Sequence, residues 1–72
     1  MKKIMILGAN NFLVPLIKTS KRLGFWTIVA SPNEKEPGFE YADEKVIVDL
    51  CDKNAVLEAA QKLKIDGFIS DQ

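Results

Sequence analysis

The sequence of 72 residues contains no histidine, one cysteine and no excess of either charge. The absence of histidine excludes the usual catalytic triads and most zinc sites. Cys51 has no partner for an internal disulfide, so we expect a reducing, cytoplasmic environment. Ten Lys and Arg residues balance ten Asp and Glu residues. Nucleic-acid binders carry a basic excess, and we therefore expect no nucleic-acid partner.

Long hydrophobic runs are also absent. No apolar run is longer than about five residues, whereas a membrane-spanning helix needs about 20. We therefore expect no association with a membrane. Lys2 and Lys3 are followed by only four apolar residues before Gly8, which is too short a run for a signal peptide. Hydrophobic residues still make up 47% of the chain, as in an ordinary globular domain.

The hydrophobic pattern predicts four strands and two helices. Short apolar or β-branched runs at 3–7, 25–30, 45–49 and 67–70 predict strands, and the first is typical of a strand buried on both faces. Apolar residues at helical spacing predict helices from about Phe12 to Leu23 and from Lys53 to Lys64. The expected packing stripes are Leu13, Leu16, Ile17, Ser20 and Leu23 in the first helix and Val56, Leu57, Ala60 and Leu63 in the second.

Helix boundaries are marked by capping residues. Asn10 or Asn11 can cap the first helix, Pro15 is tolerated only in its first turn, and Gly24 suits its end. Asp52 is placed to cap the second helix. Residues 31–44 contain two prolines, one glycine and five acids, so we expect a loop there, and its length indicates a functional or contact role.

The alternation of strands and helices predicts an α/β domain with a Rossmann-like, three-layer fold. Right-handed crossovers give a four-stranded parallel sheet of order 3-2-1-4 with one helix on each face. The fourth strand is then an unprotected edge, which native proteins avoid. We therefore expect residues 1–72 to be one domain, incomplete at its last strand, that opens a longer protein. Pairing at the same edge is compatible with a homo-oligomer.

A ligand site is expected where the strand order reverses, beyond the carboxyl ends of the first and fourth strands. Its walls are the loop Gly8, Ala9, Asn10 and Asn11 on one side and Ser70 and Asp71 on the other. Gly8 permits a tight turn, and free N–H groups at the helix start can hold an anion. The alternative is purely structural, because any turn from strand to helix favours a glycine.

Three other kinds of site fit the sequence poorly. A dinucleotide fingerprint needs three glycines, but Asn10 and Leu13 stand where the second and third belong. A phospho-receiver domain would use Asp49, but it also needs an acidic pair where this chain has Gly8-Ala9. The remaining acids, Asp43, Glu44 and Asp52, are better interpreted with Asp49 as turn and cap residues than as a metal cluster.

The chain resembles the amino-terminal, pre-ATP-grasp domain of ATP-grasp ligases. The resemblance is carried by Ile4–Ala9, Val14–Ile17 and Lys21–Gly24, and by the later pieces Pro37-Gly38, Tyr41-Ala42-Asp43-Glu44, Val48-Asp49, Asp52 and Ile65-Asp66-Gly67. It is most similar to the carbamoyl-phosphate synthase large-subunit group, and biotin carboxylase and the ATP-dependent carboxylases of purine synthesis carry a similar domain. The sequence departs from many relatives at Asn10-Asn11, where a second glycine is common.

The resemblance implies an enzyme that uses ATP and magnesium to activate a carboxylate or bicarbonate as an acyl phosphate. An amine or ammonia then attacks to form a C–N bond. ATP and magnesium are expected in further ATP-grasp domains of the same protein, with no cofactor, metal ligand or catalytic residue in this segment. This domain would wall the cleft for the non-nucleotide substrate and have no ligase activity alone.

Two hypotheses of other classes remain open. The chain can be a nucleotide- or metabolite-binding Rossmann module that regulates a partner without catalysis. It can also be an assembly domain that pairs through its open sheet edge.

Overall fold

The computed structural model describes residues 2–70 of the chain. In chain order the elements are β1 (Lys3–Leu7), η1 (Asn11–Leu13), α1 (Val14–Arg22), β2 (Trp26–Ser31), η2 (Pro37–Tyr41), β3 (Glu44–Ile47), α2 (Lys53–Leu63) and β4 (Gly67–Ser70), where η is a 3₁₀ helix. The expected strands and helices are therefore all present. The third strand begins one residue earlier and ends two residues earlier than the sequence pattern indicates.

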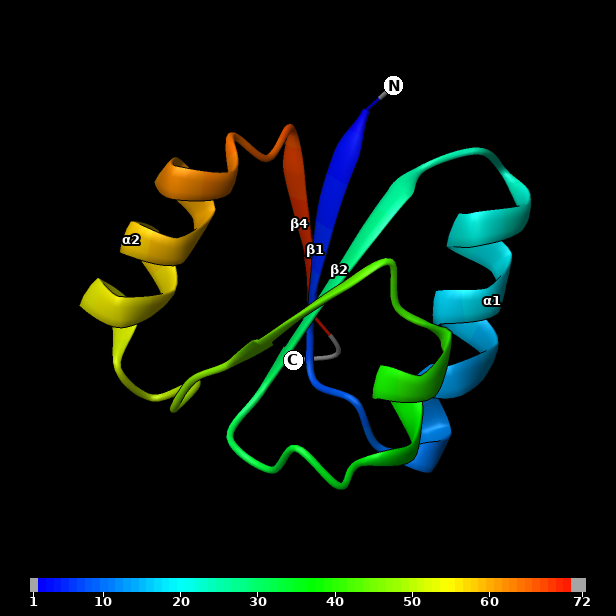
Figure 1. Cartoon of the computed structure of the whole chain (residues 1–72), viewed down its shortest axis with the longest axis horizontal. Helices are drawn as coiled ribbons and strands as arrows, with labels where there is room; N and C mark the ends of the chain where they lie inside the picture. The colour runs from blue at the N-terminus through cyan, green and yellow to red at the C-terminus, as the bar shows by residue number, and fades with distance from the viewer. Residues whose placement is uncertain (1, 71–72) are drawn as a thin grey trace.

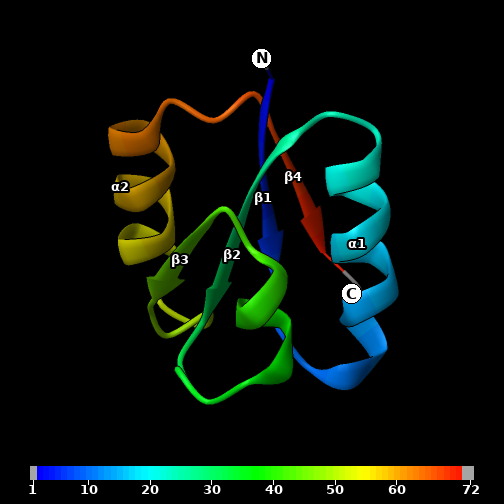
Figure 2. The same ribbon diagram turned by 45° about the vertical axis from the view of Figure 1, so that its right-hand side comes forward.

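The four strands form one parallel sheet of order β3-β2-β1-β4, which confirms the predicted topology (Figure 2). Leu7, at the carboxyl end of β1, pairs with Ala30 of β2 on one side and with Ser70 of β4 on the other. β3 pairs with the carboxyl-terminal part of β2, from Ile28 to Ser31. Within residues 2–70, β4 pairs with β1 alone, so it is the edge of the described sheet.

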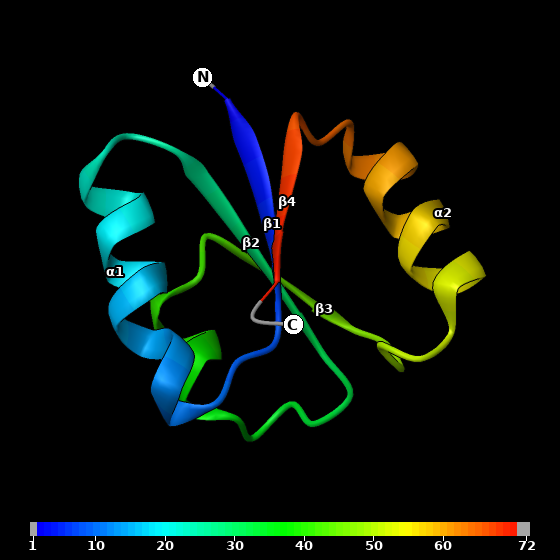
Figure 3. The same ribbon diagram turned by 180° about the vertical axis from the view of Figure 1, so that it is seen from behind.

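The two helices cover opposite faces of the sheet, with α1 on one side and α2 on the other (Figures 1 and 3). Successive residues of β1 alternate between the two cores. Ile4 and Ile6 pack in the core on the α1 face, and Met5 packs in the core on the α2 face. Because the central strand contributes to both cores, it fixes the three layers relative to one another.

The α1 face is packed mainly through Leu13 and Ile17, which are 5% and 0% exposed. Ser20, on the same stripe, is also buried. The prediction for Leu23 was wrong, because its side chain is 69% exposed. Leu23 is the C-cap of α1, so it lies past the last helical residue and no longer follows the helical stripe. Gly24, next in the chain, has a φ of 91° and ends the helix as predicted.

The α2 face is packed through a narrower stripe than the sequence indicates. Val56 and Ala60 are buried, but Leu57 is 50% exposed, which contradicts its expected place in the core. Leu57 lines a groove together with Phe68 of the edge strand β4. Asp52 caps α2 as predicted, since its Oδ1 accepts a hydrogen bond from the Ala55 N–H at 3.2 Å. Among residues 2–70, no helix is both long enough and apolar enough to cross a membrane.

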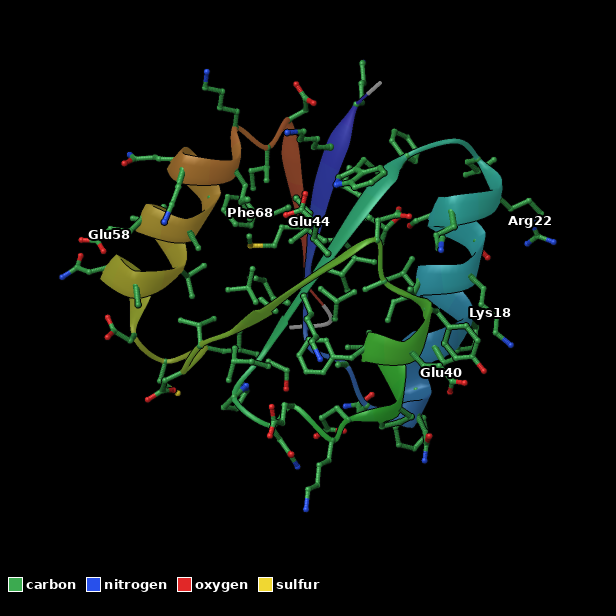
Figure 4. All side chains as sticks on the ribbon, in the orientation of Figure 1. Lys18, Arg22, Glu40, Glu44, Glu58 and Phe68 are labelled. Carbon is green, nitrogen blue, oxygen red and sulfur yellow. The ribbon has the colours of Figure 1, made fainter. Side chains whose placement is uncertain are left out.

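The segment 31–44, expected to be a loop with a functional or contact role, contains the short helix η2. Pro37 begins η2, and Gly38 and Phe39 are buried against the α1 face. Lys18 of α1 holds its Nζ 4.5 Å from the centre of the Tyr41 ring, and Figure 4 shows its side chain on the same side of the molecule as η2. Sequence periodicity missed η2 because it is only five residues long and is held by tertiary packing.

Truncation of two side chains in and after α1 tests this description of the core. Ile17→Ala should lower the free energy of unfolding by about 2–5 kcal/mol, since it removes a fully buried side chain. Leu23→Ala is the matched control and should change it by less than about 0.5 kcal/mol. Urea unfolding followed by the fluorescence of Trp26 measures both. Equal losses would contradict the assignment of Leu23 to the surface.

Candidate functional site

The candidate site begins where β1 turns into η1. Gly8 has a φ of 126°, a backbone conformation that residues other than glycine rarely adopt. A Cβ at Gly8 would also lie 2.5 Å from Cδ1 of Leu13. The Gly8 N–H donates to the carbonyl of Ala30 at 2.8 Å, so the turn leaves the sheet from a fixed point. Gly8 is therefore required by the turn itself, whatever the loop binds.

The next residue, Ala9, anchors the loop on its other side. Ala9 is 2% exposed, and its carbonyl accepts a hydrogen bond from the Gly38 N–H of η2 at 2.7 Å. The segment 31–44 thus packs directly on the candidate loop, as the contact role inferred from its length suggested. The family resemblance had also singled out the Pro37-Gly38 pair, but no sequence pattern identified Ala9 as its partner.

Asn10 uses its side chain to cap the start of the following helix. Its Oδ1 accepts hydrogen bonds from the N–H groups of Phe12 at 3.0 Å and Leu13 at 3.2 Å. The predicted cap is therefore confirmed for Asn10, and because its amide oxygen binds these two N–H groups, they are not free to hold an anion as expected. Asn11, the next residue in the chain, is exposed. A ligand at this loop would therefore meet the exposed Asn10 and Asn11 rather than an open helix start.

The opposite wall is described in part. Ser70 ends β4 and pairs with Leu7 of β1, so its backbone lies beside the strand that leads into the Gly8–Asn11 loop. Asp71 lies outside the described residues. The structure thus brings five of the six predicted positions to the carboxyl ends of the neighbouring strands β1 and β4. Their role in binding stays a prediction.

A groove opens at the same edge, on the α2 face of the sheet. Its volume is about 350 Å³, and its lining is apolar except for one lysine: Leu7, Leu50, Lys53, Val56, Leu57 and Phe68. Figure 4 shows Phe68 between the sheet and α2. Sequence reasoning missed the groove because its lining comes from β1, α2, β4 and the segment after β3. The sequence trace of the groove is Leu57, which belongs to the apolar stripe of α2. The structure leaves this side chain half exposed, so it lines the groove instead of the core.

Asp43 and Glu44, at the start of β3, tie this strand to β2. Asp43 accepts a hydrogen bond from the Thr27 N–H at 2.8 Å and donates its own N–H to the Thr27 carbonyl at 2.9 Å. Lys21 approaches the same carboxylate at 3.5 Å. Glu44 accepts from the Trp26 indole at 2.9 Å (Figure 4). The conspicuous Tyr-Ala-Asp-Glu segment therefore has a structural role.

The acids after β3 also serve turns and caps, which confirms that interpretation. Asp49 accepts the Cys51 N–H at 2.9 Å, and Asp52 caps α2. In residues 2–70, no three His, Cys, Asp or Glu side chains gather as a metal site. The carboxylates of Asp49 and Asp52 each accept a backbone N–H group in this arrangement.

A parallel sheet of order 3-2-1-4, with helices on both faces and a glycine turn at the point of strand reversal, defines a Rossmann-like α/β domain. No family model matches the chain. The chain is similar to formate-dependent phosphoribosylglycinamide formyltransferase of Prochlorococcus marinus (strain MIT 9515). The two sequences are 29% identical over 70 residues, an alignment that covers 97% of this chain and 18% of that enzyme.

Two solved structures are similar in both fold and sequence. N5-carboxyaminoimidazole ribonucleotide synthetase of Thermotoga maritima matches with a TM-score of 0.87 and 26% identity, over 100% of this chain and 20% of the other. Phosphoribosylglycinamide synthetase of Anaerococcus prevotii matches with a TM-score of 0.84 and 33% identity, over 96% of this chain and 18% of the other.

The relatives are ATP-grasp enzymes, and the matching part is their amino-terminal portion, which confirms the resemblance. The chain spans 18% of the length of the formyltransferase it matches.

The two adjacent asparagines offer a direct test of the loop geometry. Asn10→Ala should lower the free energy of unfolding by about 1 kcal/mol, because it removes the acceptor for two backbone N–H groups. Asn11→Ala, one residue away and exposed, should change it by less than about 0.5 kcal/mol. Chemical denaturation measures both variants, and Asn10→Asp should recover most of the loss. An equal effect at both positions would contradict the capping role of Asn10.

Proposed function

We propose that residues 1–72 are the amino-terminal, substrate-side domain of a longer ATP-grasp ligase. The single observation that carries this proposal is the match, over nearly the whole chain, to the amino-terminal portion of three such enzymes. The whole enzyme activates a carboxylate, formate or bicarbonate as an acyl phosphate with ATP, and an amine then attacks to form a C–N bond. The 72-residue piece is inactive alone, since it lacks the domains that clamp ATP.

The nitrogen substrate is a phosphoribosyl amine or a related ribonucleotide. The names of the three relatives, a phosphoribosylglycinamide formyltransferase, a phosphoribosylglycinamide synthetase and a carboxyaminoimidazole ribonucleotide synthetase, share a ribose phosphate. This narrows the broader expectation of a carbamoyl-phosphate synthase-like ligase toward the carboxylases and ligases of purine synthesis.

The substrate contacts come from the loop at the point of strand reversal. Asn10 and Asn11 are exposed for direct contact, whereas Gly8 and the buried Ala9 shape the loop that carries them. Ser70 and Asp71 are the proposed contacts from the other strand. Asn11 is the best candidate for a direct polar contact with substrate, because the amide oxygen of Asn10 is engaged in capping.

ATP and magnesium bind in the later domains of the same protein, and the protein works in the cytoplasm.

The exposed groove beside β4 supports the presence of further packing elements. Leu57 and Phe68 are 50% and 46% exposed at the sheet edge, and the relatives are more than five times as long as their matched portion. In the proposed enzyme, residues that follow β4 cover this groove.

The assay uses the protein encoded by the complete gene. It should release ADP only when a phosphoribosyl amine and formate, bicarbonate or an amino acid are both supplied. Asn11→Ala should raise KM for the phosphoribosyl substrate about tenfold, the loss of one hydrogen bond worth about 1.4 kcal/mol, and leave KM for ATP unchanged. Lys53→Ala, at the start of α2, is the control and should leave both KM values unchanged.

Two results would overturn the proposal. One is a stop codon after residue 72 with no ATP-grasp partner encoded alongside. The other is micromolar binding of an adenine nucleotide or NAD by the 72-residue chain in calorimetric titration, which would favour a regulatory Rossmann module instead.

A further inference from the structure

Gly38 contacts the candidate loop that begins at Gly8, although 30 residues separate the two glycines in the sequence. We propose that Gly38 is a positioning residue that holds the Gly8–Asn11 loop in its substrate-binding geometry. This inference rests on the proposed function, in which that loop walls the cleft for the non-nucleotide substrate. It assigns a role to a segment, η2, that has no other assigned function.

The first observation is a backbone tie between η2 and the loop. The Gly38 N–H donates to the Ala9 carbonyl at 2.7 Å, and both residues are buried. A buried carbonyl without a donor is unfavourable, so this bond restrains Ala9. Ala9 lies between Gly8, whose N–H is bound to the sheet, and Asn10, whose side chain caps the helix start.

The second observation is that η2 approaches the loop too closely for any side chain at position 38. A Cβ on Gly38 would lie 2.8 Å from the Ala9 oxygen and 2.9 Å from the Ala9 Cα. It would also lie 2.7 Å from Cδ1 of Ile17. The Ile17 side chain can rotate away, but the backbone of Ala9 cannot yield without a displacement of the loop.

The requirement for glycine at this position is spatial rather than conformational. Gly8 and Gly24 have positive φ angles, and Gly38 does not. Its backbone conformation is therefore open to alanine, and only the proximity of Ala9 forbids the extra methyl group. Substitution at Gly38 thus changes the distance between η2 and the loop and leaves the intrinsic backbone preference of η2 largely unchanged.

Gly38→Ala in the full-length protein is the direct test. The added methyl group should push η2 and Ala9 apart and weaken their hydrogen bond. Misplacement of a substrate-contacting loop by about 1 Å can cost up to about a hundredfold. We expect KM for the phosphoribosyl substrate to rise about tenfold or more, KM for ATP to stay unchanged and kcat to fall less than threefold, about 0.7 kcal/mol.

Two other glycine-to-alanine variants provide matched controls. At Gly67 a Cβ would meet nothing within 4 Å and φ is not positive, so Gly67→Ala should change neither KM. At Gly24 there is also nothing within 4 Å, but φ is 91°, so Gly24→Ala strains the backbone far from the loop. It should lower Tm and leave both KM values unchanged, which separates general destabilisation from loop displacement.

Amide hydrogen exchange provides a readout that does not depend on activity. In Gly38→Ala, the amides of Gly8 and Leu13 should exchange at least about tenfold faster than in the native protein, a loss of about 1.4 kcal/mol of local protection. The amide of Val56 in α2, bonded to the Asp52 carbonyl, should be unaffected. If Gly38→Ala fails to fold, Phe39→Leu loosens η2 in the same core without a backbone clash and should give the same pattern at smaller amplitude.

The outcomes separate the two proposals. Unchanged exchange at Gly8 and Leu13, or a rise in KM for ATP equal to that for the phosphoribosyl substrate, would overturn the role of Gly38. Faster loop exchange with a selective rise in KM supports it. A native protein without ligase activity, in which Gly38→Ala still accelerates loop exchange, would refute the proposed function and leave the positioning of the loop by Gly38 supported.

Discussion

The burial of β1 on both faces and its hydrogen bonding on both edges determine most of the structure. A strand in this position has no solvent-facing side, so Ile4, Met5 and Ile6 are at most 9% exposed. Two separate cores must then form, one for each face, and right-handed crossovers assign one helix to each. The same strand sets the register of β2 and β4, and its end at Leu7 fixes where the loop that follows can begin.

The two faces of the sheet are covered unequally. On the α1 face, η2 adds Phe39 to the core beside Ile17 and extends the cover toward the carboxyl end of the strands. The α2 face relies on one helix, whose buried contacts are concentrated at Val56 and Ala60. Leu57 and Phe68 are left half exposed at the β4 edge. The difference explains why the groove lies on the α2 side and the loop is tightly packed on the α1 side.

Local patterns predicted the strands, the helices and their caps because those depend on neighbours in the chain. Gly24 and Asp52 act as their residue types suggest. The prediction for Leu23 failed at a helix end, and two others failed because a distant element decides the outcome. Leu57 follows the helical stripe, yet no described strand lies beyond β4 to cover it. The short helix η2 has no periodicity of its own and is fixed by a contact with Ala9, 29 residues before Gly38.

The sequence predicted where the Gly8–Asn11 loop lies and that an asparagine caps the helix start, but it also suggested free N–H groups there, which the cap in fact occupies. Its location follows from strand order, which the sequence pattern indicates, whereas the occupation of its N–H groups depends on a rotamer of Asn10. The loop is held at three successive residues by the Ala30 carbonyl, the Gly38 N–H and the helix start. Restraint of this kind lowers the entropic cost of binding, since the loop is ordered before a ligand arrives.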